Sequence, residues 1–261
     1  MTEKGESPLL VFGDDGKPSS DRAWRWITAH PWPGWTVDVV TADTDASHIE
    51  WGTPTRPTPW TPPWERDSTN FDGVPIRFLT AASDPRALLA DAGADLMVVG
   101  IKPARQLSAA LTGSTTEWLL AHPPSPLAIV RRTDPVARVL VCVDGSPHAS
   151  RALEAFASLP LASLAAVTVL AVDDGRTDTS ATDDATRSLD GRVAEVTASR
   201  TSGTPTEEIL GAIETSRADL VVLGTRGLTG WKRLRLGSTA SAVVRSTTSD
   251  SLVACVDSDA S

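Results

Sequence analysis

The chain contains two copies of one short segment, and this duplication limits the folds that are open to it. Ala94-Asp-Leu-Met-Val-Val-Gly100 returns almost unchanged as Ala218-Asp-Leu-Val-Val-Leu-Gly224. A Gly-Ser pair follows each copy at the same spacing, as Gly113-Ser114 and as Gly237-Ser238. In a chain of 261 residues, such a repeat predicts two related units of ordinary domain size.

We expect the two domains to cover residues 1–132 and 133–261, with the same alternation of strands and helices in each. Apolar runs without an alternation of polar residues are typical of strands that are buried on both faces. In the second domain these runs are residues 138–143, 167–172, 193–198, 220–223 and 252–256, and in the first they are residues 9–12, 37–41, 76–80, 96–99 and 127–130. Helix-start residues such as Ser146-Pro147 separate the strands. The pattern predicts an α/β fold of two tandem Rossmann-like domains, each an open five-stranded parallel sheet with helices on both faces.

The glycines after the fourth strand of the second domain are typical of a phosphate-binding turn. Gly224, Gly227 and Gly237 would let the backbone bend and approach an anion, and Ser238 would open the next helix. The N–H groups and the dipole of a helix N-terminus favour negative charge. Four basic residues crowd this turn, Arg226, Lys232, Arg233 and Arg235. The alternative is a glycine-rich crossover whose basic residues are merely solvated.

A carboxylate follows the first strand of the same domain. Asp144 precedes Gly145-Ser146, and ligands of open α/β sheets bind outside the carboxyl ends of the strands, where the strand order reverses. Asp144 could therefore contact the ribose or the base of a ligand whose phosphates lie at Gly237-Ser238. The alternative is that Asp144 only caps the helix that follows.

The spacing G-x2-G-x9-G-[S/T], together with the Asp-Gly-Ser turn, resembles the universal stress protein family in its tandem two-domain form. The resemblance implies an adenine nucleotide alpha hydrolase-like fold that binds ATP, with Mg²⁺ as an accompanying ion. It implies that Asp144 and the backbone of Val172 contact the nucleoside. It further implies that the ribose and phosphates are held by Gly224, Gly227, Gly237, Ser238 and Thr239. The family also pairs its fifth strands, so residues 127–130 would lie beside residues 252–256, within one chain or between two chains of a dimer.

The sequence departs from the family pattern at several positions. Pro103 replaces the second glycine in the first domain, and proline has no N–H to donate. The first-strand loop of that domain, Gly13-Asp-Asp-Gly16, carries a carboxylate in an uncertain register. We therefore expect the first site to be weak or empty. Asp173 and Asp174 make the segment after Val172 acidic, and Ser251 stands where the family often has a proline.

A strap rich in tryptophan and proline, Trp51–Trp64, interrupts the first domain. Proline excludes a regular helix there, so an extended strap is expected. Either its tryptophans pack onto their own domain, or they form a docking surface for a protein partner or a second subunit.

Composition excludes several classes of function. The net charge of −9 argues against a nucleic-acid or membrane-surface partner. The N-terminus lacks the character of a signal peptide, no apolar run is long enough to span a bilayer, and the two cysteines lie in strand-like runs as reduced thiols would. A cytoplasmic protein is expected.

The histidines and cysteines show no metal spacing, and no G-x4-G-K-[S/T] motif, G-x-G-x-x-G motif or G-x-S-x-G elbow is present.

The sequence thus predicts no catalytic residues and no metal site of the protein itself. The leading hypothesis is an ATP-binding regulatory or stress-adaptation protein that is not an enzyme, with slow incidental ATP hydrolysis at most. The second is an interaction or scaffold protein that kept the fold and lost the nucleotide. The third is an ATP-dependent enzyme of the same fold superclass.

Overall fold

The computed structural model describes residues 7–42, 58–59, 73–101, 114–173, 180–225 and 237–255. The elements of the first half are β1 (Leu9–Gly13), α1 (Pro18–Thr28), β2 (Thr36–Ala42), β3 (Thr58–Pro59), β4 (Ile76–Ala81), α2 (Pro85–Ala90), β5 (Leu96–Gly100), α3 (Ser114–Ala121) and β6 (Leu127–Val130). Those of the second half are β7 (Arg138–Cys142), α4 (Pro147–Ser158), β8 (Ala166–Asp173), α5 (Ala181–Leu189), β9 (Glu195–Ser202), α6 (Pro205–Ser216), β10 (Leu220–Gly224), α7 (Ser238–Ser246) and β11 (Asp250–Ala254).

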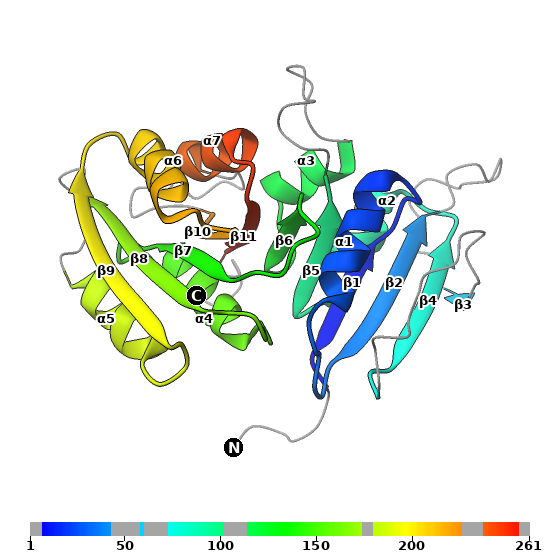
Figure 1. Cartoon of the computed structure of the whole chain (residues 1–261). Helices are drawn as coiled ribbons and strands as arrows, with labels where there is room; N and C mark the ends of the chain where they lie inside the picture. The colour runs from blue at the N-terminus through cyan, green and yellow to red at the C-terminus, as the bar shows by residue number, and fades with distance from the viewer. Residues whose placement is uncertain are drawn as a thin grey trace.

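All the strands join in a single eleven-stranded sheet, with the order β3-β4-β2-β1-β5-β6-β11-β10-β7-β8-β9 (Figure 1). Each half contributes five parallel strands, as the alternation of strands and helices predicts. The short β3 adds an antiparallel edge to β4. In both halves the strand order reverses beside the first strand, between β1 and β5 and between β7 and β10, and such switch points are where open α/β sheets bind ligands.

The two halves meet where β6 and β11 pair in antiparallel fashion. Leu252 lies opposite Ala128 at the centre of this seam, and all residues of both strands are buried. The predicted pairing of the fifth strands is therefore confirmed, and it occurs within the one chain. The boundary expected at residues 132 and 133 lies in the link between β6 and β7.

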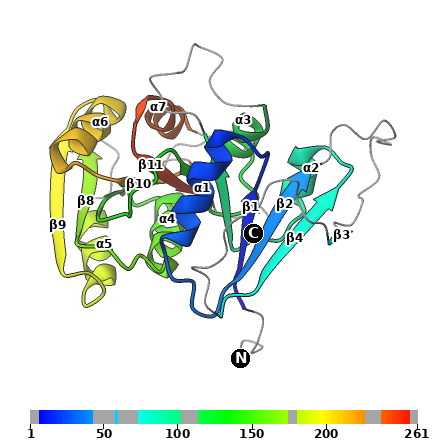
Figure 2. The same ribbon diagram turned by 45° about the vertical axis from the view of Figure 1, so that its right-hand side comes forward.

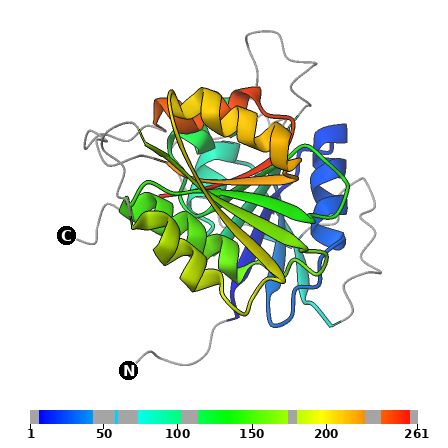
Figure 3. The same cartoon turned by 60° about the vertical axis from the view of Figure 1, so that its left-hand side comes forward.

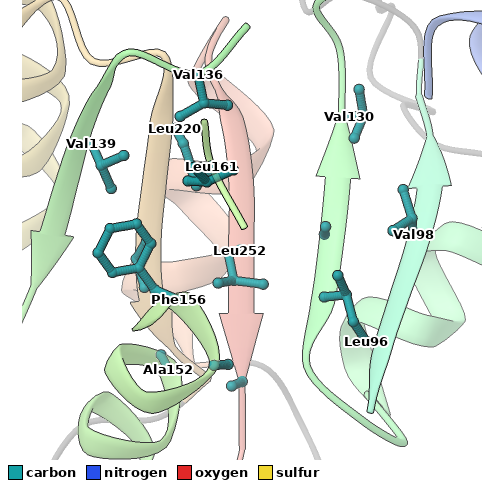
Figure 4. Packing of buried hydrophobic residues seen from close by; sticks show 14 of the residues in the cluster. Leu96, Val98, Val130, Val136, Val139, Ala152, Phe156, Leu161, Leu220 and Leu252 are labelled. Carbon is teal, nitrogen blue, oxygen red and sulfur yellow. The ribbon is translucent and has the colours of Figure 1, made fainter. Parts of the chain in front are cut away.

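Two hydrophobic cores cover the two faces of the sheet, and each core extends across the seam. One face is covered by α4 and α5 and the opposite face by α6 and α7, as Figure 3 shows for the second half. In the first half, β1, β2 and β4 lie side by side with α1 in front of the sheet (Figure 2). Figure 4 shows the part of this core around α4, with Leu96 and Val98 on one side of the seam and Leu252 and Phe156 on the other.

Charged and polar side chains also bond across the seam. Oδ1 of Asp250 accepts hydrogen bonds from the backbone amides of Arg131 at 2.7 Å and of Arg132 at 3.1 Å. The guanidinium of Arg131 donates to the carbonyl oxygens of Ser249 and Val244. Burial raises the pKa of Asp250 to about 6 despite these bonds, and burial lowers the pKa of Arg131 to about 10.

The register of the strands corrects one expectation about the fifth strand. Met97 pairs with Leu127, and Val221, its counterpart in the second half, pairs with Ser251. Asp250 therefore corresponds to Pro126, which precedes β6, so Ser251 does not occupy the proline position. The sequence alone misplaced this position by one residue because no proline marks the start of β11.

The third strand of the second half is also displaced from its predicted bounds. β9 covers Glu195–Ser202, whereas the apolar residues predicted residues 193–198. Its residues are mostly exposed, so burial imposes no apolar pattern on them. The acidic region after Val172 includes the nine-residue α5.

The tryptophan-rich strap falls outside the described residues, apart from the backbone of β3. Other aromatic residues of the first half are buried in the core on the face of α1. Trp26, His30, Trp32 and Trp35 form a chain of ring contacts at the end of α1 and the start of β2. His30 is buried and its Nδ1 lies 2.7 Å from the carbonyl oxygen of Trp26. Burial lowers the pKa of His30.

Among the described residues, no helix combines the length and the apolar character needed to cross a membrane.

Candidate functional site

The turn after β7 presents Asp144 at the carboxyl end of the sheet. Asp144 is half-buried, and its Oδ1 accepts a hydrogen bond of 2.9 Å from the amide of Ser146. Gly145 adopts a left-handed conformation, with a φ of 83°, and Ser146 caps α4 by accepting from the amide of Ala149. The helix start predicted at Ser146-Pro147 is thus confirmed, whereas Asp144 is not the N-cap of α4. Among the residues that the structure describes, none donates a hydrogen bond to the other carboxylate oxygen of Asp144.

The start of α7 forms the second part of the site. Gly237 is its N-cap and supplies no side-chain cap, so the first amides of α7 receive no hydrogen-bond acceptor from that position. Ser238 is exposed and Thr239 is half-buried. An accessible helix N-terminus whose amides lack a side-chain acceptor attracts an anion. The predicted phosphate end is therefore accessible and polar.

Thr225 lies between these two parts, and sequence reasoning did not single it out. Its carbonyl oxygen accepts a hydrogen bond of 2.6 Å from the amide of Gly237. Its Oγ1 lies 3.5 Å from Nδ1 of His148 in the first turn of α4, and its own amide donates to Ala254 at 2.8 Å. Thr225 is 2% exposed. A hydroxyl residue directly after a strand could have indicated this position, but the motif is defined by its glycines and does not specify Thr225.

Gly224 has a packing role that the motif did not predict. A Cβ at this position would lie 2.6 Å from the backbone nitrogen of Ala149 and 2.8 Å from the carbonyl carbon of His148. The first turn of α4 therefore sits directly on the end of β10. In the first half, a Cβ on Gly100 would lie 2.0 Å from the carbonyl oxygen of Ser19 in α1. This packing role leaves the predicted contact of Gly224 with a nucleotide untested.

Val172 lies near the carboxyl end of β8, the strand beside β7, and is 9% exposed. Its backbone therefore belongs to the same edge of the sheet as Asp144. A cavity of about 430 Å³ opens at Val143 and Gly145 and runs between α4 and α5, next to this edge. Glu154 and Asp184 contribute carboxylates to its lining.

The counterpart of Asp144 in the first half is Asp15. Gly13 pairs with Val40 in the first half as Cys142 pairs with Leu170 in the second, so Gly13 and Cys142 are equivalent positions. Asp15 and Asp144 each follow two residues later, which settles the register that the sequence left uncertain. Asp15 accepts hydrogen bonds from the amide of Lys17 at 3.1 Å, from Nζ of Lys17 at 2.9 Å and from Oγ of Ser20 at 2.6 Å. Burial alone would raise the pKa of Asp15, but these bonds lower it.

Both Asp15 oxygens are thus occupied by neighbouring side chains, unlike those of Asp144. Ile101 stands in place of Thr225 in the first half. The amide of Ile101 donates to the carbonyl oxygen of Val130, as the amide of Thr225 donates to that of Ala254. The first half therefore lacks the hydroxyl that reaches the first helix in the second half.

Several predicted residues lie outside the described part of the chain. These are Gly227 and the basic residues of its loop, Pro103, Gly113 and Asp174. Within the described ranges, no group of three or more His, Cys, Asp or Glu side chains could hold a metal ion.

Comparisons with known proteins agree with this architecture. Residues 181–254 match the model of the Universal stress protein family. The chain is similar in structure to a universal stress protein from Archaeoglobus fulgidus DSM 4304, with a TM-score of 0.69, 20% sequence identity, and coverage of 96% of this chain and 99% of that chain. It is also similar to a protein of unknown function from Pseudomonas aeruginosa PAO1, with a TM-score of 0.60, 15% identity, and coverage of 96% and 93% of the two chains.

At these identities the structural likeness concerns the fold. The chain is an α/β protein with two Rossmann-like units in tandem. Its resemblance to the universal stress protein family, in the two-domain form, is confirmed. No curated protein matches the chain in sequence.

Proposed function

We propose that the chain binds an adenine nucleotide, ATP in the first instance, at the carboxyl end of the sheet of its second half. One observation carries this proposal. The Asp144 turn and the uncapped start of α7 lie at the switch point between β7 and β10, and Thr225 contacts Gly237 at the start of α7 and His148 in the helix that follows the Asp144 turn. A carboxylate on one side suits ribose hydroxyls, and free helix amides on the other suit phosphates.

In this arrangement each residue has a distinct task. Asp144 and the backbone of Val172 would contact the nucleoside. Gly224, Gly227, Gly237, Ser238 and Thr239 would hold the ribose and phosphates. Mg²⁺ would arrive with ATP and be bound through the phosphates, because the described residues offer no metal-binding group of their own.

The protein would act by binding and not by turnover. A ligand changes the state of a protein only by the difference between its affinities for two states. We propose that ATP favours one conformation or association state of a cytoplasmic regulatory or stress-adaptation protein. The first half would then act through its surface, with the strap at residues 51–64 as the segment that docks a protein partner or a second subunit.

Two alternatives keep the same fold. A nucleotide-free interaction protein is favoured by the first half, where Asp15 is bound by Lys17 and Ser20. An ATP-dependent enzyme would need a residue that positions water or a second substrate, and no described residue is placed in such a role.

The direct experiment is to denature freshly purified protein and identify any released nucleotide by mass spectrometry. A thermal-shift titration with ATP and Mg²⁺ then measures affinity. Occupancy at about 100 times Kd should add roughly 2.7 kcal/mol to the free energy of unfolding. No released nucleotide and no stabilisation at millimolar ATP would favour the interaction protein, whereas sustained product formation would favour the enzyme.

A substitution at the phosphate end tests the location of the site. Gly237→Val should abolish ATP binding, because the side chain would fill the space where a phosphate approaches the start of α7. Gly113→Val, at the matching position of the first half, should change ATP binding little. Equal losses in the two variants, measured by isothermal titration calorimetry, would contradict a single functional site in the second half.

A further inference from the structure

Thr225 links the start of α7 to the first turn of α4, the helix that follows the Asp144 turn, and this position distinguishes the two halves of the chain. Its backbone carbonyl receives the amide of Gly237, the first residue of the phosphate end. Its hydroxyl lies 3.5 Å from Nδ1 of His148. His148 lies in the first turn of α4, four residues after Asp144 at the nucleoside end. Because Thr225 is buried, these contacts are shielded from competing water.

The distance between the two ends matters because a nucleotide is one covalent molecule. The two ends lie at different helices, the nucleoside end in the turn before α4 and the phosphate end at the start of α7. Thr225 accepts a hydrogen bond from Gly237, the N-cap of α7, and its hydroxyl lies 3.5 Å from His148 in α4. Binding energy from both ends adds only if their spacing matches the ligand.

We propose that Thr225 is a positioning residue of the nucleotide site, fixing the spacing between the Asp144 end and the Gly237 end. This inference rests on the proposed function. The hydroxyl of Thr225 need not contact the ligand, because Thr225 acts through His148 and the first turn of α4.

The first half supplies an internal comparison. Ile101 occupies the matching position, keeps the backbone bond to its fifth strand, and has no hydroxyl for the first turn of α1. Thr225→Val therefore makes the second half resemble the first at this position while preserving the shape and volume of the side chain. Thr225→Ser restores the hydroxyl.

The test measures the affinity of the full chain for three ligands, namely ATP, adenosine and inorganic tripolyphosphate, by isothermal titration calorimetry. Adenosine carries the nucleoside without phosphates and therefore tests mainly the Asp144 end, whereas tripolyphosphate carries only phosphates and tests the Gly237 end. Thr225→Val should weaken ATP binding by about threefold to tenfold, the loss typical of one net hydrogen bond. It should leave the affinities for both fragments unchanged, and Thr225→Ser should bind ATP as the wild type does.

His148→Ala removes the same contact from the other side, so it provides a second route to the answer. If the contact is the cause, the double variant should lose no more ATP affinity than Thr225→Val alone. Ile101→Val is the matched control, and it should leave ATP affinity unchanged. Melting temperatures of all variants report whether each remains folded.

The outcomes separate the two proposals. Wild-type protein that binds neither ATP nor either fragment would defeat the proposed function. Wild-type protein that binds ATP while Thr225→Val binds it equally well would defeat only the positioning role. A parallel loss of ATP and of both fragments in Thr225→Val would also overturn that role, because general damage to the site, and not altered spacing, would explain it.

Discussion

Gly224 has a packing role at the position where we propose a nucleotide contact. Its missing side chain lets the first turn of α4 rest on the end of β10, with a hypothetical Cβ 2.6 Å from the nitrogen of Ala149. Gly100 makes the same contact with α1 in the first half. The duplication therefore provides two similar packing contacts, of which only one adjoins the proposed site.

Gly224→Ala and Gly100→Ala should both destabilise the protein by about 1–3 kcal/mol, because backbone atoms must move to admit the methyl group. Only Gly224→Ala should also weaken ATP binding, since it displaces the turn that follows Asp144. Chemical denaturation and ATP titration of the two variants check this. An equal effect of both variants on ATP affinity would show that the loss follows from general instability.

His30 predicts a pH dependence of stability. Burial lowers the pKa of His30 below its ordinary value of 6.5, so the folded chain holds this histidine neutral. As the pH falls below about 6.5, the unfolded chain binds a proton that the folded chain does not, and stability decreases. His30→Gln should lack this loss. Urea unfolding of both proteins near neutral and mildly acidic pH measures it, and identical pH profiles would refute the assignment.

At the scale of elements, the seam between β6 and β11 predicts a pH effect of opposite sign. Burial raises the pKa of Asp250 from 3.8 to about 6, and the charged groups facing it are Arg131 and Arg132, the latter also paired with Asp219. The folded state therefore binds the proton more tightly than the unfolded state. The contribution of this group to stability is complete below about pH 3.8 and is lost as the pH rises through about 6.

Asp250→Asn keeps an oxygen that can accept from the two backbone amides, but it does not titrate. The wild type should therefore lose stability relative to this variant as the pH rises from about 4 to about 7. Because His30 acts in the opposite direction, each residue must be compared with its own variant. A constant difference in unfolding free energy between wild type and Asp250→Asn across this range would disprove the assignment.

Most elements could be predicted from sequence because burial on both faces of a parallel strand leaves an apolar run. β5, β6, β7 and β10 are of this kind, and their predicted bounds agree with the structure within a residue. β9 could not be placed as well because it is an exposed edge strand. In the site, glycines and Asp144 were evident from their spacing, whereas Thr225 acts through contacts between distant segments that spacing does not reveal.

At the scale of the whole molecule, the two cores are continuous across β6 and β11, so neither half encloses a core of its own. Glu117 of α3 and Arg245 of α7 also form an ion pair across the halves at 3.0 Å. We therefore expect one cooperative unfolding transition. Calorimetry should give a single peak whose calorimetric and van't Hoff enthalpies agree. Two resolved peaks would show that the halves unfold independently.

The seam has a further consequence because its two strands belong to one polypeptide. A pairing between separate subunits weakens on dilution, whereas a tether keeps the neighbouring strand at a high effective concentration whatever the amount of protein in the cell. The half proposed to hold ATP thus never lacks its structural companion. A low concentration of the protein would therefore reduce the number of these units without separating their two halves.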